Sequence, residues 1–223
     1  MQHLAELRRQ TVTLDGLDFD ADVTPAPPRT RREFMKTASL VAAAPMLAEA
    51  RRVMAAPAAV GTSVDATRMR SLADWTALSF DTPHPTVYGA AIFDTATGEE
   101  LMRALNAVGA QHDPSAHGEI VTIRLACAKL EKPSLKGYTL YTTCEPCPMC
   151  MACCLWAGLD RVVYGATIDD AARFGNQIMI YSADVKAHWK GACVVDGPVD
   201  RERCAALFSD PKLLAARAKR KPT

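Results

Sequence analysis

Apolar residues in this chain follow a helical period in some stretches and an extended one in others, and the two kinds of stretch alternate from about Val64 onward. Between Asp65 and Leu78 the apolar positions recur every three or four residues, which predicts a helix capped by Asp65 with one buried side. Short runs that favour extended structure and are bounded by turn residues predict strands. These runs cover residues 86–93, 99–105, 138–143, 161–166 and about 192–195.

Three further helices are predicted, two between these strands and one after the last of them. The first starts at Asp113 and Pro114, with Asp113 as N-cap and the proline at the first helical position, where its missing N–H has no helical partner. It continues to about Leu130, and the other two cover residues 148–157 and 200–217. The alternation predicts a three-layer α/β/α domain over residues 64–217, with a mixed, mostly parallel five-stranded sheet between helices.

Composition narrows the class of protein. Of 223 residues, 49% are hydrophobic and 23% charged, as in an ordinary globular protein. A net charge of +1 lacks the basic surplus of nucleic-acid-binding proteins, so we expect no nucleic-acid partner. The C-terminal residues 218–223 form a basic tail, which we interpret as a solvated helix end. No apolar run reaches the roughly 18 residues that a spanning helix needs.

The N-terminal residues 1–60 indicate an export leader. Arg31 and Arg32 precede a mildly apolar stretch, residues 38–47, which is followed by small residues at positions 48–58. Paired arginines, a weakly hydrophobic segment and a small-residue cleavage site are the parts of a twin-arginine signal. We therefore expect engagement of the twin-arginine export machinery, cleavage near residues 50–58 and a periplasmic mature protein without a membrane span.

Candidate metal ligands cluster in the middle of the chain. Cys147 and Cys150 are three residues apart at the start of a predicted helix, so both side chains lie on one face and can bind one ion. His117 lies near the start of the preceding predicted helix. A catalytic zinc uses three nitrogen, sulfur or oxygen ligands and leaves its fourth position to water. His117, Cys147 and Cys150 supply such a set, and helix N-termini favour thiolates.

The same residues carry a family resemblance. His117-Gly-Glu119, followed about 30 residues later by Pro-Cys147-x-x-Cys150, is similar to the signature of the zinc-dependent cytidine deaminase-like superfamily. The run LYTTCEPCPMC at 140–150 and the run RVVYG at 161–165 resemble its branch of guanine deaminases and tRNA adenosine deaminases. The resemblance covers roughly residues 69–172.

The resemblance implies roles for particular residues. Zinc would be held by the three residues named above, and Glu119 would be the unligated general acid/base in a hydrolytic deamination that releases ammonia. Asn106 would hydrogen-bond the substrate ring, although it can also be interpreted as satisfying a turn backbone, and the backbone of Gly118 would lie against the ring. Members of this branch are usually dimers, so we expect a homodimer. Trp156 is interpreted as a core residue rather than a stacking platform.

Two departures from the family pattern bear on the substrate. Gly118 stands where the family commonly has alanine, which loosens the helix start. Guanine deaminases carry an acidic side chain shortly after the fourth strand, whereas this chain has Asn176, Gln177 and Ile178 there, leaving Asp169 or Asp170 as substitutes. We expect a free base or nucleoside as substrate, guanine or a related aminopurine first and a cytosine-type base next.

Three alternatives remain open. A tRNA adenosine deaminase would need a basic groove, which the composition does not indicate. A structural zinc protein would want a fourth ligand rather than the free acid of Glu119. An iron–sulfur electron carrier is suggested by the spacing of four cysteines, Cys144, Cys147, Cys150 and Cys154. That alternative lacks the proline that usually follows the last cysteine, where Leu155 stands.

Overall fold

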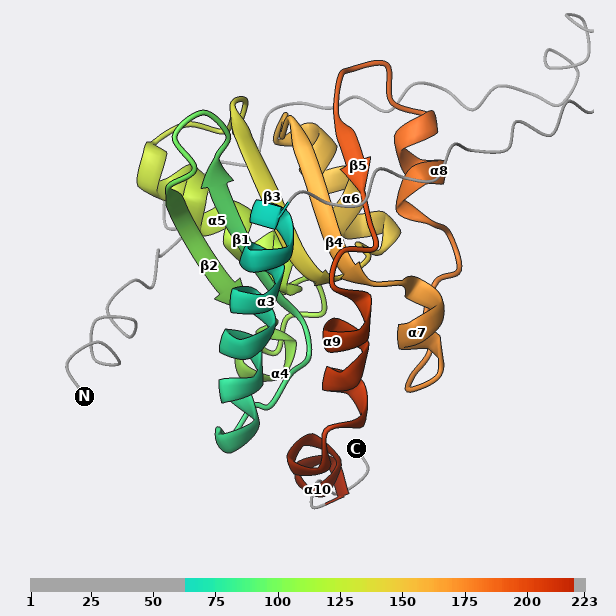
Figure 1. Cartoon of the computed structure of the whole chain (residues 1–223). Coiled ribbons are helices and arrows are strands. Elements are labelled where there is room, and N and C mark those ends of the chain that lie inside the picture. The colour runs from blue at the N-terminus through green and yellow to red at the C-terminus, as the bar shows by residue number, and fades with distance from the viewer. Residues whose placement is uncertain (1–62, 219–223) are drawn as a thin grey trace, which may run out of the picture. The chain divides into compact units, whose positions relative to one another are not determined.

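The structure is a computed structural model that describes residues 63–218, in which helices and strands alternate (Figure 1). The predicted export signal, its cleavage sites and most of the basic tail lie outside the described residues. The strands are β1 (Gly89–Asp94), β2 (Glu100–Leu105), β3 (Tyr138–Cys144), β4 (Arg161–Ala166) and β5 (Val194–Asp196). The helices are α3 (Ser63–Ala77), η2 (Leu78–Asp81), α4 (Val108–Gln111), α5 (Gly118–Leu130), α6 (Pro148–Trp156), α7 (Ile168–Ala172), α8 (Ser182–Ala187), α9 (Arg201–Ala206), η3 (Leu207–Ser209) and α10 (Pro211–Ala218).

The strands form one mixed sheet in the order β2-β1-β3-β4-β5, which confirms the predicted architecture. β1 is antiparallel to both of its neighbours, whereas β3, β4 and β5 pair in parallel. β1 therefore runs opposite to the other four strands. The parallel pairs need crossover connections, and α6 supplies the one between β3 and β4.

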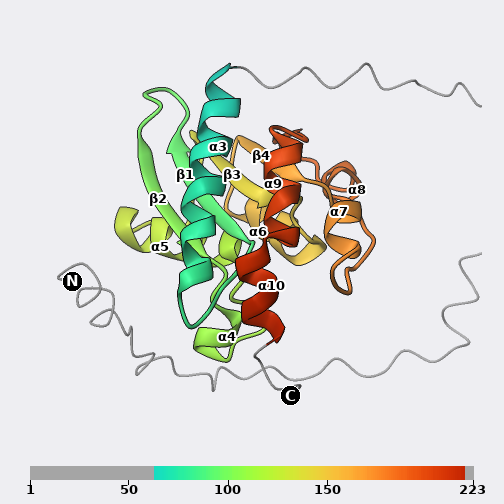
Figure 2. The same cartoon turned by 60° about the horizontal axis from the view of Figure 1, so that its bottom comes forward.

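Helices cover both faces of the sheet. α3 and α9 lie side by side on one face in both Figure 1 and Figure 2, and α5 and α6 pack on the other. Successive strand residues point to opposite faces, so neighbours in one strand enter different cores. The core under α3 and α9 includes Ala91, Tyr141 and Val163, and the core under α5 and α6 includes Ile92, Leu140 and Val162.

The helix predicted from Asp113 begins later, at Gly118. The Asp113 carboxylate accepts hydrogen bonds from the backbone N–H of Ser115, at 2.8 Å, and from its hydroxyl, at 2.7 Å. This local turn satisfies the aspartate without a helix, a competition that is common for Asp. His117 consequently becomes the N-cap residue of α5, with an extended backbone.

Other predicted boundaries and environments also need correction. The helix predicted over 200–217 is divided at Asp210, which has a ψ of 128° because the residue before a proline avoids the helical region. α3 begins at Ser63, so Asp65 lies inside its first turn. Trp156 is not a core residue: its side chain is 79% exposed and packs edge-to-face on Trp189. The sequence patterns missed three short helices, α4, α7 and α8.

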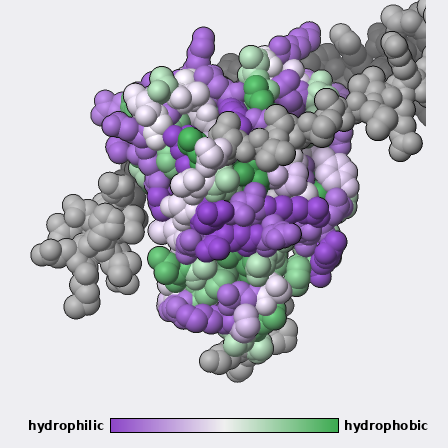
Figure 3. All heavy atoms as spheres, in the orientation of Figure 1, coloured by the Kyte–Doolittle hydropathy of each residue, from purple (hydrophilic) through white to green (hydrophobic). Residues whose placement is uncertain are grey.

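A buried ionic group connects α3 to the sheet. The carboxylate of Asp65, which is 1% exposed, accepts two hydrogen bonds from the Arg161 guanidinium at 2.8 and 3.0 Å and one from the Tyr141 hydroxyl at 2.5 Å. Arg161 also donates to Asp196 at 2.6 Å. Hydrophilic side chains cross the face that α3 and α9 form (Figure 3), and there Asp74 of α3 pairs with Arg203 of α9 in solvent.

We expect Asp65→Asn to lower the free energy of unfolding by about 3 kcal/mol, because it breaks the buried ion pair and leaves the partly buried Arg161 with Asp196 as its remaining counter-charge. Asp74→Asn is the matched control: it removes an exposed ion pair, for which we expect a loss below about 1 kcal/mol. Urea denaturation of the zinc-loaded proteins measures both values. Equal losses in the two variants would contradict a structural role for the buried group.

Candidate metal centre and its pocket

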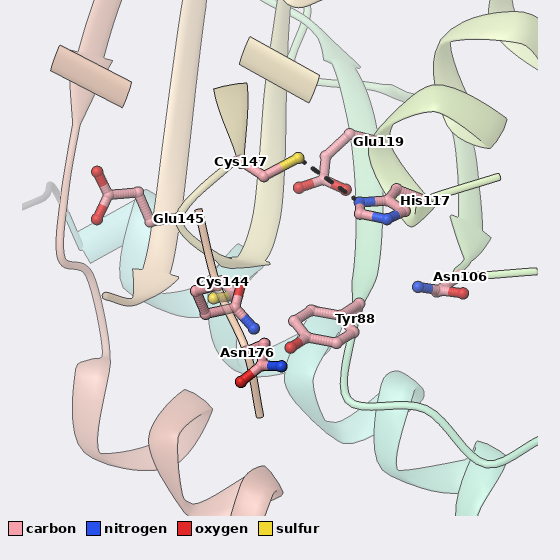
Figure 4. Close-up of a pocket in the computed structure, with 9 residues that line it drawn as sticks. Tyr88, Asn106, His117, Glu119, Cys144, Glu145, Cys147 and Asn176 are labelled. Atoms are coloured by element: carbon pink, nitrogen blue, oxygen red, sulfur yellow. Dashed lines mark hydrogen bonds between the residues drawn. The ribbon is translucent and has the colours of Figure 1, made fainter. Parts of the chain in front are cut away.

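The structure brings the three predicted metal ligands together. His117 and Cys147 are the N-cap residues of α5 and α6, and Cys150 lies in the first turn of α6. The Nδ1 atom of His117 is 3.7 Å from the Cys147 sulfur and 3.5 Å from the Cys150 sulfur. The three ligand atoms all lie within 4.8 Å of one another. In Figure 4 the Cys147 sulfur points toward the His117 ring.

The chemistry of this donor set fits zinc. One nitrogen and two sulfurs are ligands that zinc prefers, and three protein ligands leave a fourth position open. Cys150 donates a hydrogen bond to the Cys147 sulfur, and this bond, with a smaller contribution from His117, lowers the pKa of Cys147 to about 4. The same contact raises the pKa of Cys150, so the pair keeps one proton. A divalent cation bound to both sulfurs would displace that proton.

Glu119 lies in the first turn of α5, beside the metal ligands but outside their group. Its side chain is 6% exposed, and the Thr142 hydroxyl lies 3.2 Å from one carboxyl oxygen. Burial raises the pKa of Glu119 above its usual range. A buried carboxyl with a raised pKa next to an open metal position can both accept and return a proton.

A pocket of about 220 Å³ opens at this group. Its volume suits a small heterocycle better than a drug-sized ligand. It is lined by residues from five segments of the chain: Tyr88, Asn106, His117, Glu119, Cys144, Glu145, Cys147, Asn176 and Gln177. Figure 4 draws them around the cavity and labels all but Gln177.

Of the two predicted substrate contacts, Asn106 lines the pocket and Gly118 does not. The side-chain oxygen Oδ1 of Asn106 accepts a hydrogen bond from the backbone N–H of Val108 at 3.0 Å, and this bond fixes the side chain. Gly118 is absent from the lining among the described residues. A Cβ there would come within 3.2 Å of the Tyr88 carbonyl oxygen, so the missing side chain allows the start of α5 to approach the backbone before β1. Its contact with substrate stays a prediction.

The acidic residues considered as substitutes lie outside the pocket lining of the described chain. Asp170 caps α7 through Thr167 and pairs with Arg201 at 2.8 Å. Asp169 accepts a hydrogen bond from the Tyr181 hydroxyl at 3.2 Å. Asn176 and Gln177 line the pocket instead.

Sequence reasoning missed two lining residues, Tyr88 and Glu145. Glu145 stands two positions before a metal ligand, and this proximity was a usable signal. Tyr88 precedes β1 and carries no motif, so only the packing of β1 against α5 reveals it.

The other cysteines of the cluster have separate environments. Cys144 ends β3, and its sulfur lies 3.8 Å from the Thr167 carbonyl oxygen. Cys154 is fully buried in the core between α6 and the sheet. Neither belongs to the metal-ligand group found among the described residues. The arrangement therefore favours one mononuclear centre over an iron–sulfur cluster.

Sequence and structure comparisons define the class of this protein. The family model described as the cytidine and deoxycytidylate deaminase zinc-binding region matches residues 63–166. The tRNA-specific adenosine deaminase of Bacillus subtilis is 33% identical over 112 residues, which cover 50% of this chain and 68% of that protein. The chain belongs to the cytidine and deoxycytidylate deaminase family and carries its zinc-binding region.

Individual relatives add detail. The guanine deaminase of Bacillus subtilis is 41% identical over 88 residues, covering 40% of this chain. The chain spans 55% of the length of that relative. A solved structure of guanine deaminase from Nitrosomonas europaea has the same fold, with a TM-score of 0.57 and 23% identity, and the alignment covers 69% of this chain and 85% of that one.

We expect Cys147→Ser to lose the zinc, because the remaining histidine and one thiolate leave too few strong ligands. Cys153→Ser is the matched control, since Cys153 is half-buried on the same helix and outside the ligand group. Mass spectrometry of the purified proteins should find about one zinc per chain in the wild type and the control, and less than about a tenth of that in the test variant. A brown protein that holds iron through Cys144 and Cys154 would contradict the assignment.

Proposed function

We propose that this protein catalyses the zinc-dependent hydrolytic deamination of a free nucleobase or nucleoside, guanine or a related aminopurine first and a cytosine-type base next. The observation that carries the proposal is a buried, unligated carboxyl, Glu119, beside a His-Cys-Cys group at the bottom of a small pocket. Water replaces the amino group on a ring carbon, and ammonia leaves.

The ligand roles fall to His117, Cys147 and Cys150. When bound, zinc supplies a polarised water at its open position. Glu119 would take one proton from the attacking water and give it to the ring nitrogen. It would then take the second proton, from the hydroxyl that the water has left on the ring carbon, and give it to the departing amine. Its raised pKa suits this task because the protonated form is more accessible near neutral pH than it is for an exposed glutamate.

Two observations favour a free base over a nucleic acid as substrate: the small volume of the pocket and the low net charge of the chain. The pocket holds a small heterocycle, and the net charge of +1 provides little attraction for phosphates. The 41% identity to a guanine deaminase supports the same substrate class. The second candidate, deamination of adenosine in tRNA, is supported by the 33% identity to a tRNA-specific adenosine deaminase.

Assembly as a homodimer is part of the proposal. The 79% exposed side chain of Trp156, paired with Trp189, offers an aromatic surface of the kind enriched at interfaces. A monomer in light scattering at micromolar concentration would contradict it.

We expect the zinc-loaded protein to release ammonia from guanine or another aminated base, and Glu119→Gln to reduce kcat by about a thousandfold, because it removes the proton carrier. A coupled ammonia assay over a panel of bases, nucleosides and a tRNA anticodon stem measures this. Glu131→Gln, an exposed residue at the other end of α5, is the matched control and should keep its activity.

Two outcomes of this assay count against the proposal. Release from the tRNA stem alone would favour the second candidate. No release from any substrate, with one zinc bound per chain, would exclude deamination of a small substrate.

We further propose that residues 1–60 direct twin-arginine export to the periplasm. The paired Arg31 and Arg32 support this, together with the apolar stretch and small residues that follow them. The zinc-bound domain would then cross the membrane already folded. In the described part of the chain, no helix has the length and apolar character of a membrane span.

We expect Arg31→Lys with Arg32→Lys to retain the full chain in the cytoplasm of a host with a twin-arginine system, because the signal depends on the arginine pair. A second arginine pair provides the control: Arg8→Lys with Arg9→Lys makes the same substitution, with no change of charge, at residues that precede the signal. Immunoblots of periplasmic and cytoplasmic fractions measure the distribution. The same distribution for both double variants would count against the proposal.

A further inference from the structure

The segment 173–181, between α7 and α8, forms one wall of the pocket. It contributes Asn176 and Gln177 to the lining. In Figure 4, Asn176 lies beside Cys144 and Tyr88, away from His117 and the Cys147 sulfur. Neither of the two side-chain amides makes a hydrogen bond to the part of the chain that the structure describes, so both are available to a ligand.

A single buried carboxylate holds the starts of the two helices, α7 and α8, that flank this segment. Glu145 is 7% exposed. One of its oxygens accepts a hydrogen bond from the backbone N–H of Ile168, the first residue of α7, at 3.2 Å. The other accepts from the backbone N–H and the hydroxyl of Ser182, the first residue of α8, at 3.0 and 2.8 Å. In Figure 4 this carboxylate points away from the metal group.

These bonds decide what Glu145 can do. Three donors engage its oxygens, which can accept about four hydrogen bonds, so little of the carboxylate is left for a ligand. It also connects the metal-binding turn to the amide-bearing segment, because Cys147 follows two positions later. Glu145 is therefore a positioning residue, and ligand selection at this wall falls to the two amides.

We propose that Asn176 and Gln177 are specificity-determining residues. They allow the pocket to bind either a carbonyl or an amino group at the edge of the substrate ring that is remote from the reacting carbon. This inference rests on the proposed function. A side-chain amide carries both a carbonyl acceptor and an NH2 donor and can turn either toward a ligand. The wall accordingly accepts a ring carbonyl or a ring amino group at that edge. A carboxylate at the same place would only accept, and would repel a carbonyl.

Binding of a matched ligand pair tests the inference apart from catalysis. The ligands are 8-azaguanine and 8-aza-2,6-diaminopurine. They differ at one ring carbon, which bears a carbonyl in the first and an amino group in the second, and in the adjoining ring nitrogen, which carries a proton only in the first. Calorimetry uses the zinc-loaded full chain with Glu119→Gln, which prevents turnover. We expect the two Kd values to agree within about threefold, since the amide satisfies either group.

The test variants are Asn176→Asp and Gln177→Glu, each in the same background. At least one should change the ratio of the two Kd values about tenfold in favour of the diamino ligand, because the carboxylate faces a carbonyl in one complex and a donor in the other. Gln111→Glu is the matched control, since Gln111 is an exposed amide at the end of α4 outside the pocket lining. It should leave the ratio unchanged.

Ser182→Ala tests the positioning role of Glu145 with a small change. It removes one of the three hydrogen bonds, so the segment loosens while the metal ligands are untouched. We expect both Kd values to rise by about three- to tenfold with their ratio and the zinc content unchanged. Unchanged Kd values would overturn the positioning role.

The outcomes separate this inference from the proposed function. If a test variant shifts the ratio of the two Kd values but the wild type releases no ammonia, the result supports the role of the two amides and counts against deamination. If the wild type releases ammonia but the ratio moves less than about threefold in both test variants, the role of the two amides alone is overturned. A wild-type ratio above about thirtyfold, or no binding of either ligand, also overturns it.

Discussion

Ligands that are 30 residues apart in the chain can hold one ion only if α5 and α6 begin at the same edge of the sheet. The reversed direction of β1 makes this possible. Because β1 is antiparallel to both β2 and β3, those two strands point the same way, and the helices that follow them start at the same edge. β4 is parallel to β3, so α7 starts there as well. The pocket thus lies at the carboxyl ends of the strands, where open α/β sheets bind ligands.

The four buried carboxyl groups of Asp65, Glu145, Asp170 and Glu119 differ in the partners that surround them. Asp65 accepts from Arg161 and Tyr141, Glu145 accepts from three donors, and Asp170 pairs with Arg201, which lowers the pKa of Asp170. Glu119 accepts a hydrogen bond from the Thr142 hydroxyl at 3.2 Å, and burial raises its pKa. Buried charges are normally paired, so a carboxyl whose charged form is disfavoured by burial is a local loss of stability, which the proton-transfer role that we propose for Glu119 would explain.

The part of the site that lies on local sequence could be predicted, and the part fixed by distant contacts could not. Cys147 and Cys150 are three residues apart on one helix, so their joint role follows from helix geometry alone. The segment that carries Asn176 lies instead between two helices, α7 and α8, whose first residues both donate hydrogen bonds to Glu145, 31 residues before Asn176 (176 − 145).

The prediction of two helix boundaries was wrong for a similar reason. Asp113 with Pro114 was interpreted as a helix start, but Asp113 forms its own turn and α5 begins at Gly118. The helix predicted over 200–217 is interrupted at Asp210 because that residue precedes a proline. The strands were located within a few residues because their β-prone runs are bounded by turn residues. The mixed, mostly parallel character of the sheet followed from the alternation of strands and helices. Trp156 was placed wrongly because a hydrophobic side chain at the end of a helix can project outward, which the period of the helix does not reveal.

The crowded thiols are compatible with the export that we propose, for a physical reason. The described chain contains eight free cysteines, and the two in the metal group would be protected from oxidation by the ion they hold. Burial raises the pKa of each of the six others: Cys127, Cys144, Cys153, Cys154, Cys193 and Cys204. Disulfide formation proceeds through the thiolate, so a raised pKa slows it at neutral pH. A domain that folds and binds zinc before it crosses the membrane would therefore arrive in an oxidising compartment with no reactive thiolate, whereas the unfolded chain would expose all eight.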